Sequence, residues 1–129
     1  NMNLQTSGKK LILIVDDEQD LAEVLSSALM MKGLDVVIAS NGVEALKKWD
    51  EHNDIDLVIS DIRMPGLNCD GITLTKKVRE KNSSIPIILI TGYSEFTEPF
   101  AQKMGANQVV SKPFEFYEIL CLVDKYLNN

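Results

Sequence analysis

The sequence lacks the features that mark nucleic-acid-binding, membrane-spanning and secreted proteins. Its formal net charge is −6, whereas a nucleic-acid-binding module normally carries a basic patch for phosphates. No apolar run approaches the roughly 20 residues that cross a bilayer, and the polar start of the chain lacks the apolar stretch of a signal peptide. These absences predict a cytoplasmic protein that neither binds nucleic acid directly nor enters a membrane.

Cysteine is also scarce. Cys69 and Cys121 are the only two, and they form neither a metal-ligand spacing nor a disulfide framework, so we expect ordinary thiols in a reducing compartment. A chain of 129 residues can bury a stable core without disulfides or a structural metal, and it has the length of one domain. We predict a single domain over residues 9–129, with residues 1–8 as a disordered lead-in or an expression remnant.

Short apolar segments alternate with amphipathic ones along the chain. Five segments rich in Ile, Leu and Val have the length of strands, and three of them are apolar almost throughout, as is typical of parallel strands buried on both faces. They are residues 10–15, 36–39, 56–60, 86–91 and 108–111. Apolar residues at three- and four-residue spacing predict helices over about 21–29, 43–49, 71–81, 97–104 and 116–127.

The predicted helices carry recognisable signals at some of their ends. Gly33 follows the first helix as a stop signal, and Asn41 is a candidate N-cap of the second. The apolar faces that we expect to be buried include Val24 in the first helix and Val43 in the second.

Strand and helix alternate five times in this prediction. Such units form an α/β fold, in which right-handed crossovers join a five-stranded parallel sheet with helices on both faces. Ligands of such folds bind beyond the carboxyl ends of the strands, at the point where the strand order reverses. Functional residues are therefore expected just after each strand.

Polar residues with complementary chemistry follow four of the predicted strands. Asp16-Asp17-Glu18 follows the first and Asp61 the third, and the fourth ends in Thr91-Gly92 and the fifth in Ser111-Lys112-Pro113. Converging carboxylates repel one another unless a cation lies between them, and hard oxygen ligands favour Mg²⁺. The first group also fits a simpler role, which is to cap the first helix at its positive end. Capping does not explain Asp61, so the set indicates a magnesium site.

With Mg²⁺ bound, Asp61 becomes a credible nucleophile, because carboxylates form acyl phosphates and the metal neutralises the phosphoryl charge. Lys112 supplies a cation that can pair with Asp61 before the reaction and with a phosphoryl oxygen afterwards. Thr91 can donate its hydroxyl to another phosphoryl oxygen. Gly92 has no side chain that would block the approach, so its backbone N–H can lie close to the phosphate. Taken singly, Thr91 and Gly92 would be an ordinary strand end and turn.

The chain resembles the receiver domain of bacterial two-component response regulators over about residues 9–127. The resemblance rests on four motifs in the family's order: Val15-Asp16-Asp17-Glu18, Ser60-Asp61-Ile62-Arg63-Met64-Pro65, Ile90-Thr91-Gly92-Tyr93 and Ser111-Lys112-Pro113-Phe114. It implies a (βα)5 flavodoxin-like fold and a signalling switch, which catalyses only its own phosphorylation and dephosphorylation. The phosphodonor would be a histidine kinase or a phosphotransfer protein.

The resemblance also implies a role for each site residue. Asp61 is the phosphoacceptor, Thr91 the switch hydroxyl and Lys112 the family's lysine, whose bond to Pro113 is cis. The implied metal ligands are Asp16, Asp17, Asp61 and the backbone carbonyl of Arg63. Partners, an output domain or a second copy in a phosphorylation-dependent homodimer would bind at the fourth helix, fifth strand and fifth helix. The residues to test there are Phe100, Met104, Val109 and Tyr117.

Three features limit what the resemblance carries over. Val109 stands where the family usually has an aromatic residue that turns inward on activation, so the resemblance does not carry over this aromatic gate. The loop at residues 66–71 is two residues longer than the common form. Arg63 and Tyr93 flank the site at positions that in this family tune the rate of dephosphorylation.

Other functions fit parts of the pattern. A Mg²⁺-dependent phosphatase that works through a phospho-aspartate would have an acid two residues after the nucleophile, where this chain has Arg63. A flavodoxin-type carrier would have a Ser-, Thr- and Gly-rich loop in place of the acids at residues 16–18, which repel phosphate. A receiver that only docks partners would not need all of the chemical residues. A stand-alone regulator and the receiver portion of a larger regulator or hybrid kinase both fit.

Overall fold

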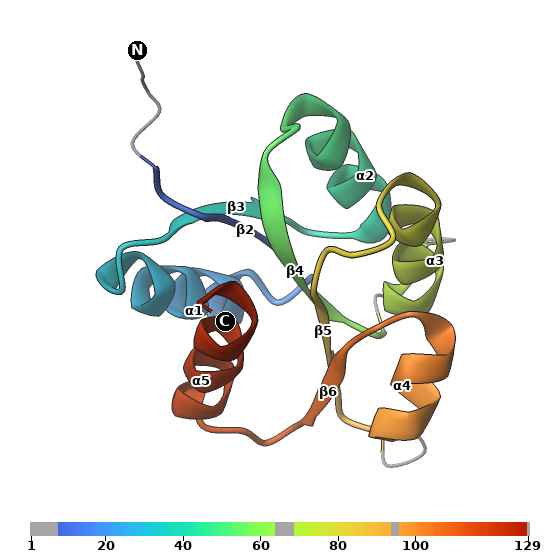
Figure 1. Cartoon of the computed structure of the whole chain (residues 1–129). Helices are drawn as coiled ribbons and strands as arrows, with labels where there is room; N and C mark the ends of the chain where they lie inside the picture. The colour runs from blue at the N-terminus through green and yellow to red at the C-terminus, as the bar shows by residue number, and fades with distance from the viewer. Residues whose placement is uncertain (1–7, 64–68, 94–95, 129) are drawn as a thin grey trace.

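The computed structural model describes residues 8–63, 69–93 and 96–128, and within these ranges strands and helices alternate as predicted (Figure 1). The strands are β2 (Leu11–Val15), β3 (Asp35–Ala39), β4 (Ile55–Asp61), β5 (Ile87–Thr91) and β6 (Gln108–Ser111). The helices are α1 (Gln19–Met31), α2 (Gly42–Glu51), α3 (Gly71–Lys81), α4 (Glu98–Met104) and α5 (Phe116–Leu127). The lead-in predicted for residues 1–8 lies, apart from Gly8, outside the described residues.

The strands form one parallel sheet in the order β3-β2-β4-β5-β6. The chain winds from β2 outward to β3 and then crosses back to β4, so its direction reverses between β2 and β4. This order confirms the predicted α/β fold with a five-stranded parallel sheet. It also places the topological switch point, where ligands bind in such sheets, at the carboxyl ends of these two central strands.

Helices cover both faces of the sheet, with α1 and α5 on one side and α2, α3 and α4 on the other (Figure 1). Successive residues of a strand point to opposite faces. Accordingly, Ile12 of β2 packs in the core beneath α1 and α5, whereas its neighbour Leu13 packs in the core beneath the other helices. Burial on both faces explains why β2 and β5 are apolar almost throughout.

The predicted helix signals lie where the helices begin and end. The Asn41 side chain caps α2 by accepting a hydrogen bond from the backbone N–H of Glu44 (2.8 Å). Gly33 follows α1 with a φ of 86°, and Gly105 ends α4 with a φ of 108°. Glycine adopts this left-handed conformation without steric penalty, so both helices end cleanly before the next strand.

Two helical positions that were predicted to be buried are exposed. Val24 is 52% exposed and Val43 is 58% exposed. In α1 the buried stripe contains Ala22, Leu25 and Leu29. One residue corresponds to roughly 100° of rotation around a helix, so Val24 points well away from its neighbour Leu25. The apolar residues of the predicted helices thus span a wider face than the one that packs against the sheet.

Within the described ranges, no helix is both long enough and apolar enough to cross a membrane.

Candidate functional site

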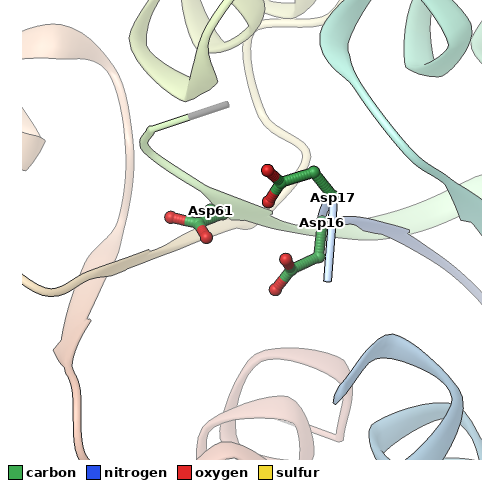
Figure 2. Close-up of side chains that lie close together, drawn as sticks. All are labelled: Asp16, Asp17 and Asp61. Carbon is green, nitrogen blue, oxygen red and sulfur yellow. The ribbon is translucent and has the colours of Figure 1, made fainter. Parts of the chain in front are cut away.

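Three aspartates come together at the carboxyl end of the sheet (Figure 2). Asp16 and Asp17 directly follow β2, and Asp61 is the last residue of β4. These strands are neighbours, with Val15 paired with Ser60, so their ends meet at the switch point. One oxygen of each carboxyl group lies within 4.8 Å of those of the other two. The fold thus gathers acids that lie far apart in the sequence.

Two of these carboxyl groups are buried. Asp16 is 4% exposed and Asp61 is 6% exposed, whereas Asp17 is exposed. Burial raises the pKa of Asp16 to about 6, although the hydrogen bond from the Glu18 backbone N–H (2.8 Å) opposes this rise. Burial also raises the pKa of Asp61, against the hydrogen bond and charge of Lys112. The cluster therefore holds more negative charge than its surroundings stabilise.

Lys112 is the cation nearest to the Asp61 carboxyl group among the described residues. Its Nζ lies 3.1 Å from Asp61 Oδ2 and 3.8 Å from a Glu18 carboxyl oxygen. Its backbone N–H donates to the Thr91 carbonyl (2.7 Å), which aligns the ends of β5 and β6. Burial lowers the pKa of Lys112, but its acidic neighbours outweigh this effect and the net direction is upward. The Lys112–Pro113 bond is cis, as the resemblance implied.

Thr91 is buried at the end of β5, with 1% of its surface exposed. Its Oγ1 accepts a hydrogen bond from the Tyr93 backbone N–H (2.9 Å) and donates a longer one to the Tyr93 carbonyl (3.5 Å). The hydroxyl is therefore engaged by its own turn. The adjacent Gly92 is exposed, and a Cβ added there would meet no atom of the described residues within 4 Å.

Arg63 lies two residues after Asp61 in the chain and contacts its carboxyl group. Its backbone N–H donates to Asp61 Oδ1 (3.3 Å), so each oxygen of that carboxyl group has a hydrogen-bond donor. The Arg63 side chain is exposed and stacks on the Tyr93 ring, with 4.5 Å between the guanidinium carbon and the ring centre. The next motif residues, Met64 and Pro65, and positions 66–68 of the lengthened loop lie outside the described residues.

Gly71, which the sequence did not single out for the site, sets how closely α3 approaches Asp61. Its backbone N–H donates to the Ile62 carbonyl (2.8 Å). A Cβ at Gly71 would lie 2.4 Å from the Asp61 carbonyl oxygen and 2.8 Å from the Ile62 Cα. Backbone atoms cannot yield as a flexible side chain would, so a glycine is needed here. The only signal in the sequence is a glycine at the first position of a predicted helix, and many ordinary helices begin in the same way.

The simpler role of the first acids, capping α1, applies only in part. Asp16 does accept a hydrogen bond from the Glu18 backbone N–H at the start of α1. Glu18 is the N-cap residue, but its side chain makes no capping hydrogen bond and instead approaches Lys112. Capping therefore accounts for one carboxyl oxygen of Asp16 and leaves Asp17 and Asp61 unexplained.

The donor set fits a magnesium ion. Carboxyl oxygens are the hard ligands that Mg²⁺ prefers, and this ion takes one or two carboxylates while keeping several waters. Asp16, Asp17 and Asp61 supply oxygens at mutual distances that allow a shared cation. The exposed position of Asp17 leaves one side open to water. A divalent cation would favour the ionised form of Asp16, against the burial that raises its pKa.

The residues expected on the face of α4, β6 and α5 differ in exposure. Phe100, Met104 and Val109 are partly buried, whereas Tyr117 is 74% exposed. Val109 pairs with Leu89 of β5 and packs against the core beneath α2, α3 and α4.

The chain is similar in sequence to response regulators. The family model for the response regulator receiver domain matches residues 12–124. The alkaline phosphatase synthesis transcriptional regulatory protein PhoP of Bacillus subtilis is 37% identical over 111 residues, which are 85% of this chain and 45% of PhoP. The regulatory protein AtoC of Escherichia coli is 40% identical over 118 residues, which are 90% of this chain and 25% of AtoC. The chain thus spans between a quarter and a half of these relatives.

Solved structures show the same fold. A CheY-like receiver domain protein from Methanospirillum hungatei superposes with a TM-score of 0.84 at 28% identity, covering 94% of this chain and 95% of that one. The response regulator TrrA from Thermotoga maritima, solved in complex with Mg(2+)-BeF, has a TM-score of 0.80 at 40% identity. That alignment covers 92% of this chain and 99% of TrrA.

Proposed function

The chain belongs to the response regulator receiver domain family, and from this premise we propose that it is a signalling switch that accepts a phosphoryl group on Asp61. The observation that carries the proposal is the position of the Asp61 carboxyl group. Its Oδ2 lies 3.1 Å from Lys112 Nζ, and one of its oxygens lies within 4.8 Å of carboxyl oxygens of Asp16 and Asp17. A nucleophile, a cation and a candidate metal site therefore meet at one strand end.

Asp16, Asp17, Asp61 and the backbone carbonyl of Arg63 are the groups that would hold Mg²⁺. When bound, the ion supplies positive charge that stabilises the transferring phosphoryl group. The TrrA complex with Mg(2+)-BeF supports this assignment, since TrrA is 40% identical to this chain. Among the described residues, Lys112 supplies the complementary cation, and its raised pKa keeps it protonated at neutral pH.

In the proposed reaction a carboxyl oxygen of Asp61 attacks the phosphorus of a phosphodonor. The new bond joins this oxygen to phosphorus, and the donor's bond to phosphorus breaks with its electron pair leaving on the donor. The backbone N–H of Arg63 and the ammonium group of Lys112 hold the carboxyl group in place. Thr91 then donates its hydroxyl to a phosphoryl oxygen, with the backbone N–H of Gly92 close by.

The phosphoryl group would favour an active arrangement that exists beforehand as a minor population. We propose a histidine kinase or phosphotransfer protein as donor. An output domain or partner would bind the face of α4, β6 and α5, where a hollow of about 650 Å³ is lined by residues such as Val109 and Tyr117. Homodimerisation through this face on phosphorylation is a further part of the proposal, as is a cytoplasmic location.

The test is intact mass spectrometry after incubation with acetyl phosphate, with and without Mg²⁺. We expect one hydroxylamine-labile phosphoryl adduct that requires Mg²⁺ and disappears in Asp61→Asn. Asp54→Asn is the matched control, because Asp54 is exposed and immediately precedes the opposite end of β4. The control should be phosphorylated like the wild type.

Two results would contradict the proposal in different ways. Mg²⁺ binding without an adduct, from acetyl phosphate and from a panel of histidine kinases, would favour a receiver that only docks partners. Absence of both Mg²⁺ binding and an adduct would contradict the proposed phosphorylation of Asp61, and only the assignment of the fold would stand.

A further inference from the structure

Helices α2 and α3 differ in charge from the rest of the chain. Together they hold six of the 13 lysine and arginine residues but only four of the 19 aspartate and glutamate residues. The remainder of the chain has 15 acidic residues against seven basic ones. The two helices lie side by side on one face of the sheet (Figure 1). Positive charge is therefore gathered on one surface of an acidic protein.

Three lysines on these helices lie along the line where α2 and α3 meet. Lys77 and Lys81 are four residues apart and lie on one side of α3, and Lys47 and Asp50 are three apart on one side of α2. Lys81 Nζ lies 3.9 Å from a carboxyl oxygen of Asp50, so these two sides face one another. All four residues are exposed. We call Lys47, Lys77 and Lys81 the lysine surface.

The lysine surface is only weakly neutralised within the chain. The Lys81–Asp50 pair is exposed, and an exposed ion pair contributes little binding energy. Among the described residues, neither Lys47 nor Lys77 forms an ion pair. A surface of one sign attracts molecules of the opposite sign. The surface is therefore suited to carboxyl groups from outside the chain.

A hollow of about 350 Å³ adjoins one end of the lysine surface. Lys81 and Asp50 line it together with Trp49 and with Ile55, the first residue of β4. Trp49 is partly buried and packs against the core, so its indole ring forms a fixed wall. An aromatic side chain can pack on this ring while acids beside it reach the lysines.

We propose that the lysine surface and the adjoining hollow form a docking site for an acidic segment of another protein, with an aromatic residue among its acids. Charge complementarity selects this occupant, because the surface is positive and the hollow offers an indole ring. A long nucleic acid is less well suited, because the acidic remainder of the chain repels a polyphosphate. The hollow lies at the amino end of the sheet, so this docking does not depend on phosphorylation of Asp61.

The first test is titration with a short synthetic peptide of glutamate and serine that has one central phenylalanine. Trp49 is the only tryptophan of the chain, so its fluorescence and its indole N–H resonance report directly on the hollow. We expect binding at low ionic strength, a change at Trp49, and amide shifts concentrated in α2 and α3. The same peptide with alanine in place of phenylalanine should bind about fivefold weaker, because it lacks the ring that packs on the indole.

Charge variants test whether the attraction belongs to this surface. Lys77→Gln with Lys81→Gln should weaken peptide binding about tenfold, because two ion pairs with the peptide are lost. The matched control is Lys32→Gln with Lys103→Gln, which removes the same charge from exposed positions outside α2 and α3 and should stay within about twofold. Asp50→Asn should tighten binding about threefold, because it removes the acid that competes for Lys81.

These measurements use neither Mg²⁺ nor a phosphodonor, so their outcome is independent of the proposed function. No binding by the wild type, equal weakening in the two double variants, or binding without a change at Trp49 would overturn the proposal. Tighter binding of a DNA duplex than of the peptide, lost in Lys77→Gln with Lys81→Gln, would assign the surface to nucleic acid instead. Dimerisation of the unliganded protein through the same lysines, seen by sedimentation, would assign it to a second copy.

Discussion

Polar side chains have opposite surroundings at the two ends of the sheet. At the amino end, Asn107 Oδ1 accepts hydrogen bonds from the Ile87 backbone N–H (2.9 Å) and from Arg79 (3.1 Å). Arg79 also donates to the carbonyls of Gly105 (2.7 Å) and Asn82 (3.2 Å). This network ties the end of α3 to the loop between α4 and β6, and it matches each of these acceptors with a donor.

The carboxyl end gathers like charges instead. Two buried carboxyl groups, Asp16 and Asp61, lie beside the exposed Asp17, and burial raises the pKa of both buried groups. Lys112 forms an ion pair with Asp61 in this cluster. Hydrogen-bonding side chains therefore stabilise the fold where donors and acceptors match, and the carboxyl groups leave an excess of negative charge where we propose that a cation binds. Four predictions test this contrast, from the largest expected effect to the smallest.

Arg79→Met should lower the free energy of unfolding by about 3 kcal/mol. Methionine keeps the apolar stem but leaves the carbonyls of Gly105 and Asn82 and the Asn107 oxygen without this donor. Urea unfolding measures the loss, and Mg²⁺ affinity should stay within about twofold of the wild type, since the change lies at the opposite end. Lys76→Met, at an exposed position of α3, is the control and should change stability by less than about 0.5 kcal/mol. Equal effects of the two variants would contradict the amino-end network.

Gly71→Ala should lower the free energy of unfolding by about 2 kcal/mol and weaken phosphorylation of Asp61. The added Cβ would meet the Asp61 carbonyl at 2.4 Å, so α3 or the end of β4 must move. Gly92→Ala is the control for stability, because a Cβ there meets no atom of the described residues within 4 Å. Denaturant unfolding of both variants is the measurement, and wild-type stability of Gly71→Ala would show that the close approach is not needed.

Asp16→Asn should have opposite effects on metal binding and on stability. Mg²⁺ affinity should fall at least tenfold, about 1.4 kcal/mol, because even partners of metal ligands contribute factors of roughly 10–100. The metal-free protein should become more stable by about 1 kcal/mol, because a buried charge is removed. Calorimetry and urea unfolding report the two effects, with Asp54→Asn as the control. Loss of stability together with loss of affinity would indicate a purely structural Asp16.

Lowering the pH from 7 to 5 should stabilise the metal-free protein through Asp16 by about 1 kcal/mol. The folded-state pKa of Asp16 is about 6 against 3.8 for an ordinary aspartate, so the folded state binds this proton more tightly than the unfolded state. The contribution is complete below the unfolded pKa and is lost as the pH rises through about 6. The test compares urea unfolding at both pH values in the wild type and in Asp16→Asn. The same pH dependence in both proteins would count against it.

Much of the fold could be predicted from the sequence, because its signals are local. The apolar strands and the cap at Asn41 depend on residues near one another in the chain, and they appear where predicted. The predicted burial of Val24 and Val43 was wrong because the width of a helix's buried face depends on what packs against it. Spacing along one helix carries no information about that neighbour.

In the candidate site, too, some residues could be indicated by the sequence and others could not. Asp16, Asp17, Asp61, Thr91 and Lys112 could be proposed as site residues from the sequence, because parallel strands bring their carboxyl ends to one edge. Gly71 could not be recognised, since its role depends on the Asp61 carbonyl. The Arg63–Tyr93 stack likewise joins loops that follow different strands.

The sequence alone determined the alternation of strands and helices, the parallel sheet and the residue types at the strand ends. Periodicity and strand-end position are properties of the chain, so they need no coordinates. Only the tertiary structure decided which carboxyl groups are buried, that Lys112 lies 3.1 Å from Asp61, and that the Thr91 hydroxyl is bound by its own turn. Burial and charge proximity are relations between distant segments, and they exist only once the strands are side by side.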